Sequence, residues 1–318
     1  MPPPSAAKGI VLSLMCLALM GVMPIVSNLR PAEIGALPFA FALSVWQAVF
    51  ILPLFLMELR SGTLGVFGLN LSPRERARMI AVAVLTGAMF GLSTYLYVLG
   101  VEKAGAANAA IAIQAYPLFA ILVESLFLKR WKTPLELGLT LIVLATLYYL
   151  GTGGTLRMAG LSVWFLASLG VPLVWSIAHI IIKEELGRTP VTPIQVTFFR
   201  VLISTVFLFA VLALTEPSGL AALPGVAVFR TMSAVMGLVY GLELILWFYA
   251  LRHIDVSLAS SITTPWSVLT MVLAVLLLGE TIAPYQIGAL VIVVACIYGL
   301  TLASLRREKA PAAAARTV

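Results

Sequence analysis

Glu243 is the residue whose surroundings most clearly indicate chemistry. It lies in the middle of a long apolar stretch, with Tyr240 three residues before it and Trp247 four residues after it. Residues at positions i, i+3 and i+7 share one face of a helix. A carboxylate between two aromatic rings suits an ammonium group, because countercharge and cation–π contact act together where water is excluded. The alternative is a buried ion pair with Arg200 or His179 that fixes helix packing.

His179 and Arg200 also lie inside apolar stretches. An ionisable group at the centre of a membrane helix costs about 2.5–3.5 kcal/mol, so each is a functional candidate if these stretches span a bilayer. His179 shares a stripe with Trp175 and can exchange a proton near neutral pH. This indicates either proton coupling or a hydrogen-bonded structural histidine. Arg200 is interpreted as holding helices together or facing the cytoplasmic entrance, and direct contact with the substrate is the weaker alternative.

The composition indicates an integral membrane protein. Hydrophobic residues make up 61% of the 318 residues and charged residues only 10%, whereas about a quarter of an ordinary soluble domain is charged. A helix needs about 20 mainly apolar residues to cross a bilayer. The sequence therefore predicts an all-α integral membrane protein with ten transmembrane helices, at residues 9–29, 37–57, 78–100, 105–128, 134–152, 160–182, 193–215, 229–251, 257–278 and 283–304.

The chain is internally duplicated at a constant offset of 150 residues. Residues 85–150 align with residues 235–300 without a gap, so that Gly87, for example, corresponds to Gly237. Each half has five helices, an odd number, so the second half starts on the opposite side of the membrane from the first. The sequence thus predicts two inverted five-helix repeats of the kind found in transporters. The predicted units are residues 1–152, residues 153–308 and a disordered cytoplasmic tail at residues 309–318.

The duplication also relates the two halves of the candidate site. The positions that correspond to Tyr240, Glu243 and Trp247 keep the aromatic pair but replace the carboxylate by a hydroxyl, as an asymmetric solute would require; these positions are Phe90, Ser93 and Tyr97. The duplication therefore favours a site that binds an asymmetric solute.

The fourth and ninth predicted helices add polar and aromatic groups at corresponding positions. Gln114 corresponds to Thr264, and Tyr116 corresponds to Trp266. Pro117 and Pro265 are expected to kink these helices, and the freed carbonyl groups are tolerated where they line a cavity. The predicted substrate-binding residues are Ser93, Tyr97, Gln114, Trp175, His179, Tyr240, Glu243, Trp247, Thr264 and Trp266.

The basic residues predict the orientation of the chain in the membrane. Of the twenty Lys and Arg residues, fifteen fall on the side of the N-terminus, four fall on the opposite side, and Arg200 lies within a span. Lys and Arg accumulate on the cytoplasmic side. We therefore expect a multi-pass protein of the bacterial cytoplasmic (inner) membrane with both termini in the cytoplasm. The net charge of +7 is then a topology signal and not a sign of nucleic-acid binding.

Three predicted helix starts share one capping signature, a hydroxyl residue followed by Pro and then by Glu or Gln at the third helical position. The interpretation is that Glu75, Glu136 and Gln195 cap helices and do not take part in transport. The three segments are Ser72-Pro73-Arg74-Glu75, Thr133-Pro134-Leu135-Glu136 and Thr192-Pro193-Ile194-Gln195.

Other function classes have little support in the sequence. An intramembrane hydrolase would need a nucleophile–base pair or a metal cluster, yet the two histidines and two cysteines show no grouping with ligand spacing. No G-x-x-x-x-G-K-[ST] stretch occurs, so gradients must supply any energy. The sequence predicts no enzyme, cofactor, metal or nucleic-acid partner. The expected partners are a small-molecule substrate, the lipid bilayer and protons, and the expected state is a monomer or weak homodimer.

Two corresponding segments resemble a known family. These segments are "AYPLFAILVESLFLKRWKTPLELG" at residues 115–138 and "PWSVLTMVLAVLLLGETIAPYQIG" at residues 265–288. Together with the five-plus-five arrangement, they resemble EamA-type members of the drug/metabolite transporter superfamily. The Gly-Glu pair typical of that family is kept at Gly279-Glu280 and replaced by Lys129-Arg130 in the first half. Its Trp-Gly in the first helix is replaced by "MGVMPIVSNL" at residues 20–29.

The resemblance implies a secondary transporter, commonly an exporter, with a central cavity between the two halves. Combined with Glu243, it predicts alternating-access transport of a small organic metabolite such as an amino acid or amine. A non-transporting scaffold or lipid-binding protein remains an alternative. A carrier of anionic metabolites is disfavoured, because Arg200 is the single Lys or Arg residue that lies well inside a predicted span and not at its end.

Overall fold

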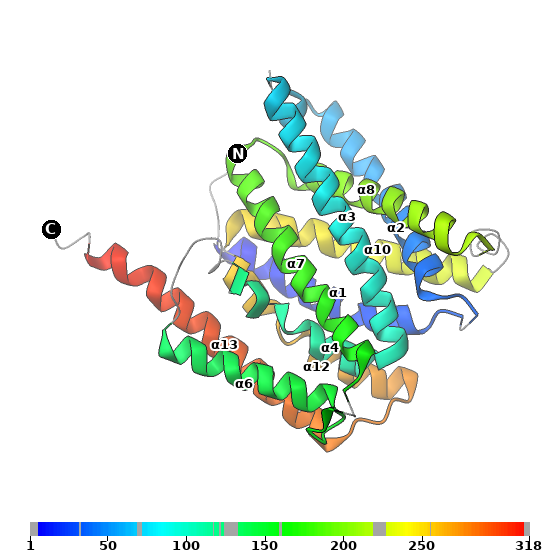
Figure 1. The fold of residues 1–318 in the computed structure, drawn as a ribbon. Coiled ribbons are helices and arrows are strands. Elements are labelled where there is room, and N and C mark those ends of the chain that lie inside the picture. Colours follow the sequence, from blue (N-terminus) through cyan, green and yellow to red (C-terminus); the bar gives the residue numbers. More distant parts are fainter. Residues whose placement is uncertain are drawn as a thin grey trace.

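The computed structural model describes residues 6–31, 33–68, 72–116, 118–120, 122–123, 133–158, 161–218, 227–254 and 256–314. Within these ranges every regular element is a helix (Figure 1). The first half contains α1 (Ala6–Asn28), α2 (Ala36–Arg60), η1 (Gly65–Gly68), α3 (Pro73–Ala104), α4 (Ala106–Ile113) and α6 (Pro134–Gly151). The second half contains α7 (Val163–Arg188), α8 (Pro193–Thr215), α10 (Ala227–His253), α11 (Val256–Thr263), α12 (Trp266–Leu273), η3 (Ala274–Leu278) and α13 (Pro284–Ala314).

The helices have the length and hydropathy of a membrane protein. In the described part of the chain, six are long and apolar enough to cross a bilayer, namely Ala6–Asn28, Ala36–Gly68, Pro73–Ala104, Val163–Ile182, Pro193–Thr215 and Arg230–His253. The shorter apolar helices are Ala106–Ala120, Leu137–Gly151, Trp266–Leu278 and Pro284–Leu300. The predicted all-α architecture with ten helices is confirmed.

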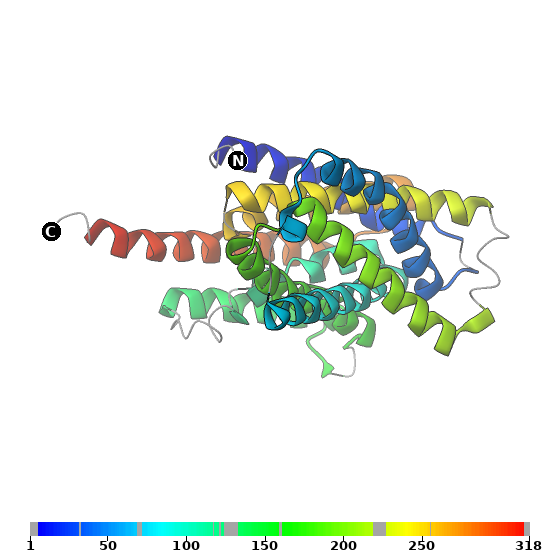
Figure 2. The same ribbon diagram turned by 90° about the horizontal axis from the view of Figure 1, so that it is seen from above.

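Equivalent helices of the two halves make equivalent contacts. α1 packs against α10, and its counterpart α7 packs against α3, the counterpart of α10. In the same way α3 contacts α8 while α10 contacts α2. The equivalent helices α6 and α13 lie side by side and run in opposite directions (Figures 1 and 2). This is the relationship that an inverted repeat requires.

Two of the predicted capping boxes are present. Ser72 Oγ accepts a hydrogen bond from the Glu75 backbone at 3.3 Å, and Glu75 Oε2 accepts one from the Ser72 backbone at 2.9 Å. At the start of α8, Thr192 Oγ1 and Gln195 make the same reciprocal bonds, at 3.1 and 3.5 Å. The side chain of Glu136 in the third box lies outside the described residues. Local sequence therefore fixes where α3 and α8 begin.

The two helices that carry Gln114 and Thr264 are interrupted near the middle of the bundle. α4 ends at Ile113, while α11 ends just before Thr264 and α12 begins just after Pro265. Proline has no backbone N–H, so the hydrogen-bond ladder cannot continue through it. Pro117, the other predicted kink, lies outside the described residues. A π-turn at η3 follows α12, and no sequence pattern predicted it.

α13 extends further than the sequence predicted. Disorder was expected from residue 309, but α13 is helical to Ala314, and residues 315–318 lie outside the described part. Alanine has the highest helix propensity, so the alanines near the C-terminus continue the helix. The boundary between the two repeat units remains a prediction.

A carboxylate of the second repeat joins the two repeats at one end of the bundle. Glu280 accepts hydrogen bonds from the backbone N–H groups of Ala106 at 2.9 Å and Ala107 at 3.3 Å. It accepts a third from Asn28 Nδ2 at 3.5 Å. The free N–H groups and the dipole at a helix N-terminus favour an anion. Glu280 thus caps α4 of the first repeat, whose preceding residue Gly105 has a φ of 84° and offers no capping side chain.

An ion pair strengthens the same end of the bundle. Arg30 pairs with Glu102 near the end of α3. The guanidinium also donates to the backbone carbonyls of Ser27 at 2.9 Å and Ile34 at 3.1 Å. These contacts hold the connection between α1 and α2 against the end of α3.

Candidate functional site

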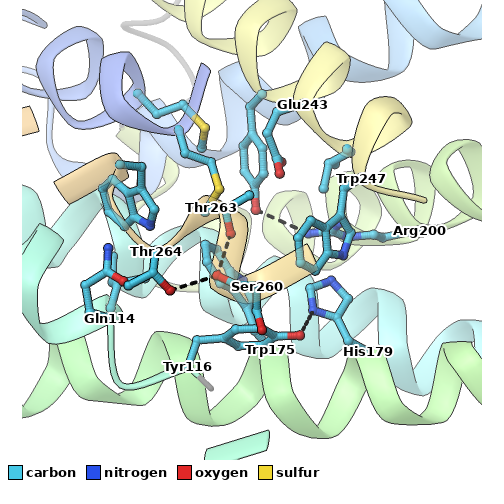
Figure 3. A pocket seen from close by; sticks show the side chains of 16 residues that line it. Gln114, Tyr116, Trp175, His179, Arg200, Glu243, Trp247, Ser260, Thr263 and Thr264 are labelled. Carbon is cyan, nitrogen blue, oxygen red and sulfur yellow. Dashed lines mark hydrogen bonds between the residues drawn. The ribbon is translucent and has the colours of Figure 1, made fainter. Parts of the chain in front are cut away.

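A cavity of about 50 Å³ lies where the two halves meet, among α1, α7, α8, α10 and the interrupted helices (Figure 3). Its wall consists of Met20, Met23, Ile113, Gln114, Tyr116, Trp175, His179, Arg200, Tyr240, Glu243, Leu244, Trp247, Ser260, Thr263, Thr264 and Trp266. A buried water needs roughly 10–15 Å³ of such space. The cavity therefore has room for a few water molecules and must widen to hold an organic solute.

The wall contains most of the residues that the sequence predicted for the site, namely Gln114, Trp175, His179, Tyr240, Glu243, Trp247, Thr264 and Trp266. Ser93 and Tyr97 do not belong to it. Trp175 Nε1 donates a hydrogen bond to Ser93 Oγ at 3.0 Å, and the Tyr97 ring stacks on Trp175 with centroids 6.5 Å apart. Ser93 and Tyr97 therefore support the Trp175 side chain of the wall instead of facing the cavity.

Glu243 is an unpaired carboxylate in the cavity wall. Only 6% of the residue is exposed. Within the described residues, its carboxylate takes part in no hydrogen bond and in no ion pair, whereas its backbone carbonyl accepts a hydrogen bond from Cys16 Sγ at 3.6 Å. An ionised carboxylate taken out of water is costly unless a cation compensates it. The site is therefore suited to a cationic group from a solute or to a proton.

Arg200 belongs to the same wall but is anchored elsewhere. Its Nη2 donates a hydrogen bond to the Tyr240 hydroxyl at 3.2 Å. The centre of the guanidinium lies 3.4 Å from the centroid of the Phe90 ring, in cation–π contact. Nη1 is buried and has no hydrogen-bond partner. The side chain is thus held in place while part of its donor capacity stays unused.

His179 belongs to an aromatic group on one side of the cavity. Its Nδ1 lies 3.2 Å from the Tyr116 hydroxyl, while Nε2 is buried without a partner. The Trp247 ring is 5.9 Å from the imidazole and 6.4 Å from the Tyr116 ring, measured between centroids. Figure 3 shows Trp247 of α10, Trp175 and His179 of α7, and Tyr116 beyond the end of α4 converging on the cavity. These rings present apolar faces to any solute that enters.

The interrupted helices supply the remaining polar groups. The hydroxyls of Thr263 and Thr264 donate to the Ser260 backbone carbonyl at 3.0 and 2.8 Å (Figure 3). Gln114 is 2% exposed, and its side-chain nitrogen has no hydrogen-bond partner. The break between α11 and α12 thus supplies hydroxyl groups to the wall, and the end of α4 supplies an amide.

The sequence did not place several wall residues in the site. Arg200 was interpreted as a packing or entrance residue, and Met20, Met23, Ser260 and Thr263 were not singled out. The correspondence of Tyr116 to Trp266 was the one signal available for Tyr116, and both residues line the cavity. Met20 and Met23 could not be assigned to the cavity from the sequence, because an apolar residue in an apolar helix does not show which face of the helix it occupies.

A second cavity of about 440 Å³ lies toward the end of the bundle opposite Glu280. It is bounded by η1, the first turns of α3, the last turns of α7 and the start of α8; its lining residues are Val66, Phe67, Arg76, Met79, Ile80, Val82, Ala83, Thr86, Ile182, Glu185, Thr189, Val191, Val196, Phe199 and Arg200. Arg78 and Glu185 form an ion pair of 2.6 Å between α3 and α7 at the same end. Arg200 lines both cavities and so lies between them.

The sequence matches the EamA-like transporter family over residues 7–152 and residues 162–302. The chain belongs to this family. Each half of the EamA-like chain carries one matched segment, and the protein is accordingly a multi-pass membrane transporter and not an enzyme. Within the described ranges, no group of three or more His, Cys, Asp or Glu side chains could hold a metal ion.

Solved structures share the EamA-like fold. One that is described only as "Crystal structure of protein" is 19% identical in sequence, with a TM-score of 0.63. The match covers 96% of this chain and 100% of the other. At this identity the likeness establishes the fold alone. No sequence of a curated protein matches the chain.

Proposed function

We propose that this EamA-like protein is a secondary active exporter of a small organic metabolite with an ammonium group, such as an amino acid or an amine. The observation that carries the proposal is the Glu243 carboxylate, which is buried in the cavity wall without a partner among the described residues. Trp247 and Tyr240 lie on the same helix face and in the same wall. A cation between a carboxylate and an aromatic face is stabilised by the opposite charge of the carboxylate and by cation–π contact with the ring.

The competing explanation, a structural ion pair between Glu243 and Arg200 or His179, has less support. Arg200 directs Nη2 to Tyr240 and its guanidinium plane to Phe90, and His179 directs Nδ1 to Tyr116. Neither side chain forms an ion pair with Glu243, and all three residues are described. A buried charge retained without a structural partner is typical of a transport site.

Alternating access is supported by the difference between the two ends of the bundle. At one end Glu280 and the Arg30–Glu102 pair join neighbouring helices, whereas the cavity of about 440 Å³ lies at the other. If the N-terminus is cytoplasmic, α3 begins and α7 ends on the cytoplasmic side, and the larger cavity faces the cytoplasm. This arrangement fits an exporter that loads its solute there.

The experiment that tests the function is a solute screen followed by a transport assay. The purified protein is screened by thermal shift against a metabolite panel that includes amino acids, amines, organic acids and nucleotide sugars. Each hit is then tested for counterflow in proteoliposomes. We expect stabilisation and counterflow with ammonium-bearing solutes. Counterflow confined to anionic solutes would contradict the proposed substrate class, and binding of lipids without any solute flux would favour the scaffold alternative.

A further inference from the structure

The cavity wall contains more unused hydrogen-bond donors than an amine could satisfy. Four buried side-chain nitrogens of the wall lack a partner, and they are Gln114 Nε2, His179 Nε2, Arg200 Nη1 and Trp247 Nε1. Each of the four residues is less than one-tenth exposed. Three of these nitrogens can only donate, because amide, guanidinium and indole N–H groups have no acceptor capacity at nitrogen. Among the described residues, Glu243 is the one acidic residue of the wall.

A buried donor without a partner costs about 1–3 kcal/mol, so such groups are retained where a ligand or a second conformation satisfies them. An ammonium group has no acceptor to offer, and it can serve Glu243 alone. The donors instead require an acceptor-rich group. A carboxylate provides two oxygens with about four lone-pair sites and matches the planar fork of an arginine.

We infer that the solute is a zwitterionic α-amino acid, whose ammonium group binds Glu243 and whose carboxylate binds Arg200 with help from Gln114 and Trp247. This inference rests on the proposed function and makes it more specific. It also assigns Arg200 a direct role in substrate selection, because a simple amine leaves its Nη1 unpaired.

The position of Arg200 fits this role. The residue lines both the central cavity and the larger cavity, through which the proposed exporter loads its solute. A solute that enters from the larger cavity therefore meets Arg200 before it reaches Glu243, whose side chain lines only the central cavity. Tyr240 and Phe90 hold the guanidinium at this boundary. The carboxylate is then recognised first, and the ammonium group is recognised after the central cavity widens.

A set of matched probes tests the inference. The twenty amino acids are measured for binding to the purified protein, together with the amines obtained by removing the carboxylate and the acids obtained by removing the ammonium group. Wild-type protein should bind at least one amino acid tenfold or more tighter than either matched probe. Equal affinity for an amino acid and its amine would overturn the inference.

The variants separate the two ends of the solute. Arg200→Gln should lower affinity for the amino acid at least tenfold while leaving affinity for the matched amine within about twofold. Glu243→Gln should lower affinity for both. Arg252→Gln is the matched control, because Arg252 donates to the Val191 backbone at 3.3 Å and belongs to neither cavity. If Arg200→Gln weakens the amine as much as the amino acid, Arg200 does not select the carboxylate.

Two further measurements keep the outcomes distinct. Gln114→Leu retains the Arg200 contacts with Tyr240 and Phe90, and it should also lower affinity for the amino acid more than affinity for the matched amine. This variant replaces Arg200→Gln if Arg200→Gln does not fold. Binding of amines without any amino acid would refute the zwitterion and leave the proposed function intact. Binding of the deaminated acids alone would refute the ammonium site at Glu243, and with it the proposed function.

Discussion

Arg200 and Glu243, both within the described residues, line the same cavity without forming an ion pair with each other. Arg200 is held by the Tyr240 hydroxyl at 3.2 Å and by the face of Phe90, whereas the Glu243 carboxylate has no such anchor. Opposite charges that are kept apart at the centre of a membrane protein are available to a solute that carries both. The separation of these two side chains thus underlies the proposed substrate class.

The aromatic rings of the wall should contribute directly to affinity. Trp247→Ala removes a ring beside Glu243, and we expect a loss of about 2 kcal/mol, or roughly thirtyfold in affinity, because a desolvated cation loses its aromatic contact. Trp164→Ala is the control, since Trp164 lies on α7, is 42% exposed and does not line the cavity. Equal losses in the two variants, measured by binding titration, would show that the rings only stabilise the fold.

Ser93 should act through Trp175. Ser93→Ala leaves the Trp175 indole N–H buried without its acceptor, which costs about 1–3 kcal/mol of stability. We expect a lower melting temperature and a loss of affinity smaller than that of Trp247→Ala. Ser233→Ala serves as the control, because Ser233 is equally buried and its hydroxyl donates only to the Arg230 carbonyl within α10, at 3.1 Å. A melting temperature unchanged in Ser93→Ala would argue against this supporting role.

Glu280 should control the opening of its end of the bundle. Glu280→Gln removes the anion from the N-terminus of α4. We expect the closed state to lose about 1 kcal/mol of stability relative to the open state, so that the population of the open state rises roughly fivefold. The probe is a cysteine in place of the buried Ser27, in a protein whose Cys16 and Cys296 are replaced by alanine. Its labelling by a hydrophilic maleimide should rise several-fold.

Glu75→Gln is the matched control for Glu280, because Glu75 caps α3 within its own repeat. Its replacement should leave Ser27 labelling unchanged. Equal labelling in the parent and in Glu280→Gln would show that this contact does not hold the end closed.

The orientation of the chain follows from the positive-inside bias. Reporters fused after Lys8 and after Arg307 should both be cytoplasmic, and a reporter inserted near Arg157 should lie outside. Alkaline phosphatase and fluorescent-protein fusions measure this directly. A C-terminus on the outer side would contradict the ten-helix arrangement with inverted repeats.

Patterns that can be found in the sequence alone predicted the fold well. Apolar stretches predicted the helices, and the hydroxyl–Pro–Glu/Gln signature predicted the starts of α3 and α8. The internal duplication at an offset of 150 residues predicted the two repeats. Glu243 could be found because a lone carboxylate in an apolar helix is conspicuous. The tail was less predictable, because a helix that starts in the membrane can continue through an alanine-rich segment beyond it.

The details of the site depended on three-dimensional features that the sequence does not encode locally. Ser93 corresponds to Glu243 by the duplication, yet Ser93 lies behind Trp175, because the cavity is not symmetric between the halves. Ser260 and Thr263 belong to the wall, where α11 ends at Thr263 and Pro265 interrupts the helical period before α12. The role of Arg200 became visible only when its partners and its unused donor were known.

The charge of Glu243 is the central element of the proposed function, and Glu243→Gln tests it most directly. The variant keeps the volume and most of the hydrogen-bonding capacity of the side chain, so it should fold. Its affinity for the best ammonium-bearing solute of the screen should fall at least about tenfold, or 1.4 kcal/mol, while Glu216→Gln at the exposed end of α8 should match the parent. If Glu243→Gln abolishes only accumulation driven by a pH gradient and spares exchange, the carboxylate carries a coupling proton instead. A variant that binds, exchanges and accumulates the solute like the parent would contradict the account.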